Sequence, residues 1–151
     1  MGCVHRAAAA AFMLALASTL PAAAQQEQQD KPKQKKPSLS LKANPAVSFA
    51  PSRVVLVADV KGGSDDYEEF YCATVTWEWG DGTESENATD CEPYEAGRSA
   101  IQRRFATDHK YDLPGEYRVF FKLKRGDKVV GSASTTVRVR PGLRDVGDVG
   151  Y

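Results

Sequence analysis

The sequence has few of the residues that most enzymes use for catalysis. It contains two histidines and three cysteines among 151 residues. It has no G-x-S-x-G motif, no H-E-x-x-H motif and no glycine-rich phosphate-binding loop. These absences argue against a serine hydrolase of that type, a zinc peptidase and a P-loop nucleotidase.

Excess charge and long apolar runs are also missing. The 20 basic residues balance the 20 acidic ones, so overall charge favours neither nucleic acid nor a membrane surface as a partner. The apolar run at residues 7–20 follows Arg6 and leads to Ala22, Ala23 and Ala24. It is too short to span a bilayer comfortably, and it ends in an A-x-A pattern. This predicts a signal peptide over residues 1–24 and a secreted or periplasmic protein.

The segments around the main body have little apolar content. Residues 25–38 are rich in Gln, Lys and Pro, which predicts a disordered linker. Residues 141–151 are broken by glycines and are expected to form a flexible tail. Residues 39–140 then remain as one domain.

Two cysteines, Cys72 and Cys91, follow the predicted signal peptide. An even pair in an exported chain indicates a disulfide. Cys72 alternates with the apolar residues of its predicted strand, so we expect the bridge to lie on the outside or at an edge of the fold.

Sustained helical periodicity is absent, apart from one expected turn of helix near residues 92–99. Strand patterns recur instead, at residues 39–42, 47–49, 53–60, 70–79, 100–107, 117–124 and 129–140. Short strands separated by turns predict an all-β protein, an antiparallel β-sandwich. A two-residue turn would point Val137 and Val139 outward, so we expect a bulge near Gly131, or a longer turn, to absorb one residue.

The central pattern is a strand with Trp77 and Trp79 on its apolar face, ended by the turn residues Gly80, Asp81 and Gly82. A second pattern combines an H-x-Y with a P-G-x-Y. Together they resemble the PKD domain over about residues 46–139. The residues that match its motifs are Trp77, Trp79, Gly80, Asp81, Gly82, His109, Tyr111, Pro114, Gly115 and Tyr117.

The resemblance implies an immunoglobulin-like sandwich of about seven strands. It also implies a non-catalytic module that makes extracellular protein–protein or protein–carbohydrate contacts, with no cofactor. Two features differ from the family pattern. Trp79 stands where Phe is usual, and the segment at residues 84–105 is longer than the usual connection.

One candidate binding face follows from strand alternation in the last two strands. An exposed aromatic among cations suits an acidic protein or an anionic polysaccharide. The alternative is a charged surface that discourages aggregation between sheets. The residues of this face are Arg118, Phe120, Lys122, Lys124, Arg138 and Arg140.

Two smaller features give further hypotheses. Four acids in residues 65–69 could bind calcium, although they lack the register of a calcium loop and are also explained as a charged turn. They are Asp65, Asp66, Glu68 and Glu69. The tripeptide Arg125-Gly126-Asp127 resembles an integrin-binding loop, and it is also what a hairpin turn requires.

Two other function classes remain open. A polysaccharide-binding accessory protein of a secreted hydrolase system would need an exposed aromatic platform, with Phe120, Tyr94 and Phe105 as its members. A small enzyme would have to use His109 beside Asp108 as a general base. Both are alternatives to the binding module.

Overall fold

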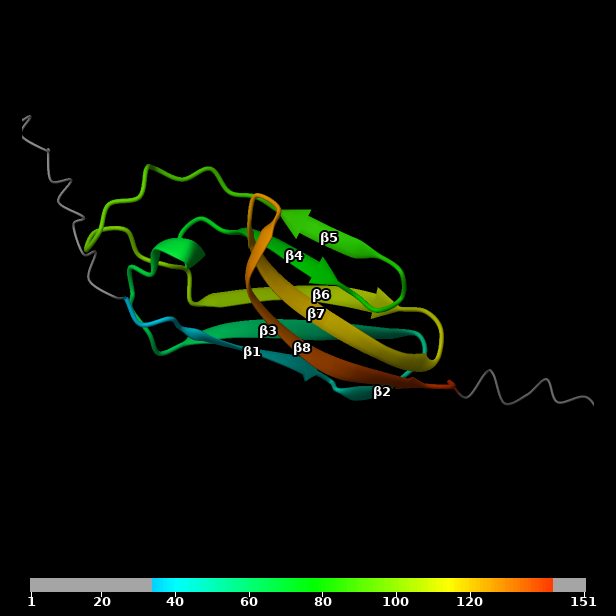
Figure 1. Ribbon diagram of the computed structural model, residues 1–151. Helices are drawn as coiled ribbons and strands as arrows, with labels where there is room; N and C mark the ends of the chain where they lie inside the picture. Colours follow the sequence, from blue (N-terminus) through cyan, green and yellow to red (C-terminus); the bar gives the residue numbers. More distant parts are fainter. Residues whose placement is uncertain (1–33, 143–151) are drawn as a thin grey trace, which may run out of the picture. The chain divides into compact units, whose positions relative to one another are not determined.

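The computed structural model describes residues 34–142. The predicted signal peptide, residues 25–33 of the linker and residues 143–151 of the tail lie outside this range. Eight strands and one short 3-10 helix make up the described part (Figure 1). They are β1 (Ser38–Asn44), β2 (Val47–Phe49), β3 (Ser52–Lys61), η1 (Glu68–Phe70), β4 (Thr74–Glu78), β5 (Glu84–Asn87), β6 (Arg104–Tyr111), β7 (Gly115–Arg125) and β8 (Lys128–Arg140).

The strands form two sheets. One has three strands in the order β1-β3-β6, and the other has five in the order β2-β8-β7-β4-β5. All pairs are antiparallel except β2 with β8. This confirms the predicted all-β class and an immunoglobulin-like sandwich. Among residues 34–142 no helix is long and apolar enough to cross a membrane.

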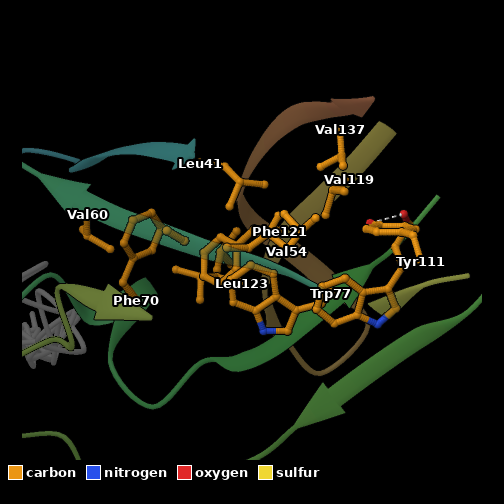
Figure 2. Close-up of a cluster of buried hydrophobic side chains, with 14 of the residues drawn as sticks. Leu41, Val54, Val60, Phe70, Trp77, Tyr111, Val119, Phe121, Leu123 and Val137 are labelled. Carbon is orange, nitrogen blue, oxygen red and sulfur yellow. Dashed lines mark hydrogen bonds between the residues drawn. The ribbon is translucent and has the colours of Figure 1, made fainter. Parts of the chain in front are cut away.

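The core lies between the two sheets, and strand alternation builds it. The β-branched and leucine residues of β3 alternate between buried and exposed along its length. β7 does the same with Val119, Phe121 and Leu123. Trp77 and Trp79 pack beside them, with exposed fractions of 6% and 4%. Figure 2 shows these side chains meeting from both sheets.

The expected bulge is present next to Gly131. Leu123 pairs with Gly131, but Lys124 pairs with Val129, so Val130 has no partner across the ladder. The extra residue turns Val137 and Val139 into the core. A side chain at Gly131 would collide with Leu39 and Phe70, at 2.7 and 2.9 Å from its Cβ. Glycine at this position therefore lets Phe70 pack against β8.

The central strand is shorter than predicted. β4 begins at Thr74 rather than at residue 70, because the preceding residues bend into η1. The amide of Phe70 donates to the carbonyl of Tyr67 at 3.0 Å, and Cys72 has a φ of +52°. Such a conformation cannot continue a strand.

The long connection after β4 also differs from the prediction. Residues 84–87 form β5, an edge strand whose exposure on every residue hid it from pattern analysis. The single turn expected near residues 92–99 is present, since the amides of Arg98 and Ser99 both donate to the carbonyl of Glu95. The next strand, β6, starts at Arg104, four residues later than expected.

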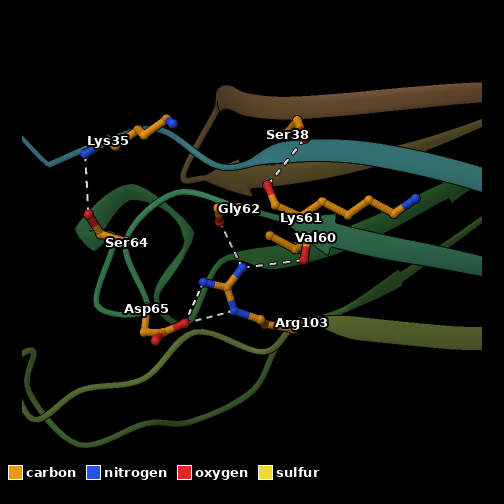
Figure 3. Close-up of polar contacts among 8 residues, drawn as sticks. All are labelled: Lys35, Ser38, Val60, Lys61, Gly62, Ser64, Asp65 and Arg103. Carbon is orange, nitrogen blue, oxygen red and sulfur yellow. Dashed lines mark hydrogen bonds and ion pairs between the residues drawn. The ribbon is translucent and has the colours of Figure 1, made fainter.

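The end of the predicted linker contacts the domain. The side chain of Gln34 donates to the Asp66 carbonyl at 2.9 Å and accepts from the Glu68 amide at 3.1 Å. Lys35 exchanges two hydrogen bonds with Ser64, one of which is drawn in Figure 3. These polar residues therefore pair with exposed backbone of the 62–68 loop, which composition alone does not predict.

Arg103 holds that loop against the end of β3 (Figure 3). Its guanidinium donates to the Gly62 carbonyl at 2.9 Å and to the Val60 carbonyl at 3.3 Å. Its Nε and one terminal nitrogen also donate to Oδ1 of Asp65, and the Nε–Oδ1 distance is 2.9 Å. Asp65, one of the four acids predicted as a possible calcium site, is thus paired with Arg103.

Candidate interaction site

The residues that carry the family resemblance meet at one end of the sandwich. The ring of Trp79 stacks on Trp77 at 5.8 Å and on His109 at 4.3 Å between ring centroids. The indole N–H of Trp79 donates to Ser85 Oγ at 3.0 Å. This row of parallel rings joins β4 to β6 across the two sheets, which is a structural role.

Asp81 organises the turn after β4. Its Oδ1 accepts hydrogen bonds from the amide and hydroxyl of Thr83, at 3.0 and 2.6 Å, and its Oδ2 lies 2.7 Å from Nε2 of His109. Burial on its own would raise the pKa of Asp81, but these hydrogen bonds outweigh it and hold the pKa below its usual value. The carboxylate is therefore ionised at neutral pH.

Two tyrosines complete this end of the domain. The buried hydroxyl of Tyr111 donates to the Trp79 carbonyl at 2.9 Å, and the hydroxyl of Tyr117 donates to the Leu113 carbonyl at 2.8 Å. Burial raises the pKa of the Tyr111 phenol strongly, and the Asp81 charge adds to the rise. The phenol is therefore a neutral donor at physiological pH.

The enzyme alternative rested on His109 beside Asp108, and the structure separates that pair. Asp108 projects from the opposite face of β6 and pairs with Arg53. His109 faces Asp81 instead, and both side chains are about one-fifth exposed. Among residues 34–142 the His109 side chain makes one hydrogen bond, the one to Asp81. Its contacts are those of a residue that secures the turn.

Three acids of the 65–69 loop, Asp65, Asp66 and Glu69, each bind a different partner. Asp65 binds Arg103, the Asp66 carboxylate accepts from the Gly97 amide at 3.0 Å, and Glu69 accepts from the Tyr67 hydroxyl at 3.0 Å. The described chain holds no group of three or more His, Cys, Asp or Glu side chains suited to a metal ion.

The two remaining predicted features are also placed by the structure. Cys72 and Cys91 form a disulfide that ties the 88–103 connection to the residues just before β4. The Gly126-Asp127 pair makes a two-residue hairpin turn between β7 and β8. The guanidinium of Arg125 donates to the Glu68 carbonyl, so it is held against η1.

The six residues of the predicted binding face lie together on the outer face of the five-stranded sheet. Three of its cations pair with carboxylates of the same sheet: Lys122 with Glu78, Lys124 with Glu86 at 3.6 Å, and Arg138 with Glu116 at 2.8 Å. Arg118 and Lys122 lie over the Phe120 ring at 5.4 and 5.7 Å from its centroid. The face is therefore mixed in charge rather than basic.

Sequence reasoning missed other members of this face. Val47 and Phe49 on β2 pair in register with Arg138 and Arg140, and they are 49% and 62% exposed. A depression of about 400 Å³ lies between Phe120, Arg118 and the β4–β5 turn, with Glu78 and Glu84 on its walls. Alternation within β7 and β8 could not reveal these residues, because they come from strands paired at long range.

The aromatic platform expected for a polysaccharide-binding protein is not assembled. Phe120 lies on the outer face of the five-stranded sheet, whereas Phe105 packs 5.2 Å from Phe121 inside the sandwich. Tyr94 lies in the long connection, where its hydroxyl donates to the Asp66 carbonyl at 2.7 Å.

Comparisons with known proteins identify similar folds but no sequence relative. No protein-family model matches, and no curated protein matches the sequence. A PKD domain of a peptidase from a Thermoplasmatales archaeon is 16% identical, with a TM-score of 0.47 over 70% of this chain and 98% of that chain.

Two structures of a CARDB domain from Pyrococcus furiosus also match. The crystal structure, in complex with di-metal ions, is 12% identical with a TM-score of 0.45 over 72% of this chain and 96% of that one. The solution structure is 13% identical with a TM-score of 0.45 over 70% of this chain and 97% of that one. The matches thus include a PKD domain, the domain that the sequence motifs resemble.

Proposed function

We propose that this chain is an exported, non-catalytic binding module that docks a protein partner through the outer face of its five-stranded sheet. The observation that carries this proposal is the exposure of Phe49, at 62%, beside its register partner Arg140. Export is supported by the predicted signal peptide together with the Cys72–Cys91 disulfide.

The composition of this face supports a protein partner. Aromatic residues and arginine are enriched at the centres of protein interfaces. Exposed apolar side chains such as Val47 and Phe49 stabilise a complex when a partner removes them from water. The alternating cations and carboxylates set the orientation of a partner with complementary charges. A polyanion would instead be repelled by the carboxylates between the cations.

The test compares two matched double variants of the full chain. In Phe49→Ser/Arg140→Glu, the apolar and cationic groups of the proposed interface are lost. Val55→Ser/Lys42→Glu is the control. It likewise replaces one apolar residue by serine and one cation by glutamate, but on the outer face of the three-stranded sheet, where Val55 is 44% exposed. Thermal unfolding first verifies that both variants fold.

Each protein is then immobilised and exposed to the native secretome, and captured proteins are quantified. We expect the first variant to capture at least about tenfold less of a partner that the wild type and the control variant both capture. A tenfold loss of affinity corresponds to about 1.4 kcal/mol of binding free energy. Equal capture by all three proteins would remove this face as the site. Loss in the control variant alone would move the site to the other sheet.

A further inference from the structure

Strand β6 forms a long edge of the three-stranded sheet. It has eight residues, contains no proline and keeps a continuous register with β3. The other edges are better protected: β5 has four residues, two of them glutamates, and β2 has three residues between Pro45 and Pro51. β1 lies against β8, where Leu39 meets Gly131. Among residues 34–142, β6 is therefore the edge with the fewest features that block pairing with another strand.

The backbone of β6 alternates between pairing with β3 and facing outward. The amide of Val60 donates to the Arg103 carbonyl at 2.8 Å, and Asp59 is the register partner of Arg104. Because hydrogen-bonded and non-bonded pairs alternate in an antiparallel ladder, the N–H and C=O groups of residues 104, 106, 108 and 110 point away from β3. Within the described chain, only the Arg104 carbonyl among these groups has a partner, Nε2 of Gln102 at 2.8 Å. The others form an unpaired row of donors and acceptors.

A groove of about 370 Å³ runs beside this row, between β5 and β6. On the groove side of β5 the side chains are short and polar, since Ser85 is the register partner of Trp77 and Asn87 is that of Val75. Glu86 is the one ionisable residue of the lining, and it pairs with Lys124. A strand added to β6 would lie about 4.8 Å from it. Every second side chain of that strand would then enter a small, largely neutral groove.

The opposite side of β6 carries a pattern of charge. On the outer face of the three-stranded sheet this strand presents Arg104, Ala106, Asp108 and Lys110. The three charged side chains pair with neighbours of the same chain but remain 72%, 46% and 56% exposed. Opposite charges directly across two strands stabilise their pairing, and like charges oppose it. The edge therefore favours a strand with an acid opposite Arg104, a cation opposite Asp108 and an acid opposite Lys110.

We propose that β6 binds an extended peptide segment of a protein partner by antiparallel strand addition. The main chain of the segment pairs with residues 104–110 and extends the three-stranded sheet by a fourth strand beside β5. Its side chains opposite Phe105 and Thr107 enter the groove, so they are small and neutral, such as Val or Thr. Main-chain pairing supplies affinity, and the charges and the groove select the segment. This edge is separate from the outer face of the five-stranded sheet.

The experiment titrates the full chain with two heptapeptides that are acetylated and amidated at their ends. The matched peptide, Glu-Thr-Lys-Thr-Val-Val-Glu, places opposite charges across from Lys110, Asp108 and Arg104, in that order. The inverted peptide, Lys-Thr-Glu-Thr-Val-Val-Lys, places like charges there. Amide chemical shifts locate binding, and the matched peptide should shift residues 104–110 with a Kd below about 1 mM. The inverted peptide should bind at least about tenfold more weakly.

Two N-methylated forms of the matched peptide test the main-chain pairing. A methyl group on the amide of the fifth residue, opposite Ala106, removes a hydrogen bond of the added ladder and should weaken binding at least about tenfold. A methyl group on the amide of the fourth residue, opposite Thr107, points away from β6 and should change the Kd less than about threefold. Contacts made by side chains alone would not distinguish the two positions.

Variants of the chain test the register. Arg104→Glu/Asp108→Lys should prefer the inverted peptide, the reverse of the wild type. Ala106→Pro removes an outward N–H that makes no bond to β3, so it should fold and bind at least about tenfold more weakly. Phe49→Ser/Arg140→Glu, on the outer face of the five-stranded sheet, should bind like the wild type. Thermal unfolding verifies that each variant is folded, and the charge exchange decides the matter if Ala106→Pro is not.

Several results would overturn the proposal. These are no shift of β6 amides with the matched peptide, equal affinities of the wild type for both peptides, or equal weakening by the two methyl groups. Protection of the Ala106 amide from hydrogen exchange that grows with protein concentration, without peptide, would assign the edge to a second copy of this chain. Loss of peptide binding in Phe49→Ser/Arg140→Glu would place the peptide on the five-stranded sheet, so this proposal and the protein-binding face fail by different observations.

Discussion

At the residue scale, Asp81 connects parts of the chain that are distant in sequence. Its two oxygens hold Thr83 within the β4–β5 turn and His109 on β6. His109 in turn stacks on Trp79. One carboxylate therefore fixes both the turn and the ring that covers the end of the core.

We expect Asp81→Asn to lower the free energy of unfolding by about 1–3 kcal/mol at neutral pH, because hydrogen bonds to an ionised group are lost. The folded-state pKa of Asp81 lies below its reference value of 3.8. Its stabilisation is therefore complete above the unfolded-state pKa and is lost as the pH falls through the folded-state value. The difference between wild type and variant should shrink as the pH drops below about 4.

Urea unfolding between pH 2 and pH 8 measures this difference. Asp112→Asn is the matched control, since Asp112 pairs with Lys110 on the surface and its side chain is 66% exposed. Such a pair contributes at most about 1 kcal/mol. A cost for Asp81→Asn that stays constant down to pH 2 would contradict an ionised, hydrogen-bonded carboxylate.

At the element scale, the β4–β5 turn depends on two glycines for different reasons. Gly80 and Gly82 both have positive φ, at +81° and +90°. A Cβ at Gly80 would lie 2.6 Å from the carbonyl oxygen of Arg118, whereas a Cβ at Gly82 would meet nothing within 4 Å. The turn therefore packs directly onto the backbone of β7.

This difference gives a matched pair of substitutions. Gly82→Ala should cost about 1–2 kcal/mol, the strain of a left-handed conformation alone. Gly80→Ala should cost clearly more, because it adds a collision with backbone that cannot move without disturbing β7. Chemical unfolding of both variants measures the two costs. Equal costs would mean that the turn shifts away from Arg118 freely.

The strands also show how much of the fold could be predicted from the sequence. Alternation placed the core faces of β3, β4 and β7 correctly, because each pattern is local to one strand. It also required one extra residue between β7 and β8, in a bulge near Gly131 or in a longer turn, and the structure has the bulge. The start of β4 was wrong, since the chain turns at Tyr67 to bury Phe70 against Gly131, a contact made across 61 residues.

The candidate site was predictable to the same degree. Arg118, Phe120 and Lys122 alternate within β7, so their common face followed from the sequence. Their partners did not, because the pairing of Glu78 with Lys122 depends on the register between β4 and β7. Phe49 was missed for a similar reason: it joins the face only through the parallel pairing of β2 with β8.

At the scale of the whole domain, the long connection between β5 and β6 is attached at several points. Ile101 is buried, and its amide donates to the Asp65 carbonyl at 2.8 Å. The Tyr71 hydroxyl donates to the Glu92 carbonyl at 3.0 Å. These contacts position the connection in the folded state, so the disulfide acts chiefly on the unfolded chain.

Cys72→Ser/Cys91→Ser should therefore fold with the same two sheets but with lower stability. The two cysteines are 19 residues apart in sequence, and closing a loop of about 20 residues stabilises by roughly 3 kcal/mol in the chain-entropy model. Unfolding in urea, with and without dithiothreitol, measures the difference. Reductant should lower the midpoint of the wild type to that of the variant and leave the variant unchanged. An unchanged wild-type midpoint would mean that the anchors at Ile101 and Tyr71, and not the covalent link, set the stability of this connection.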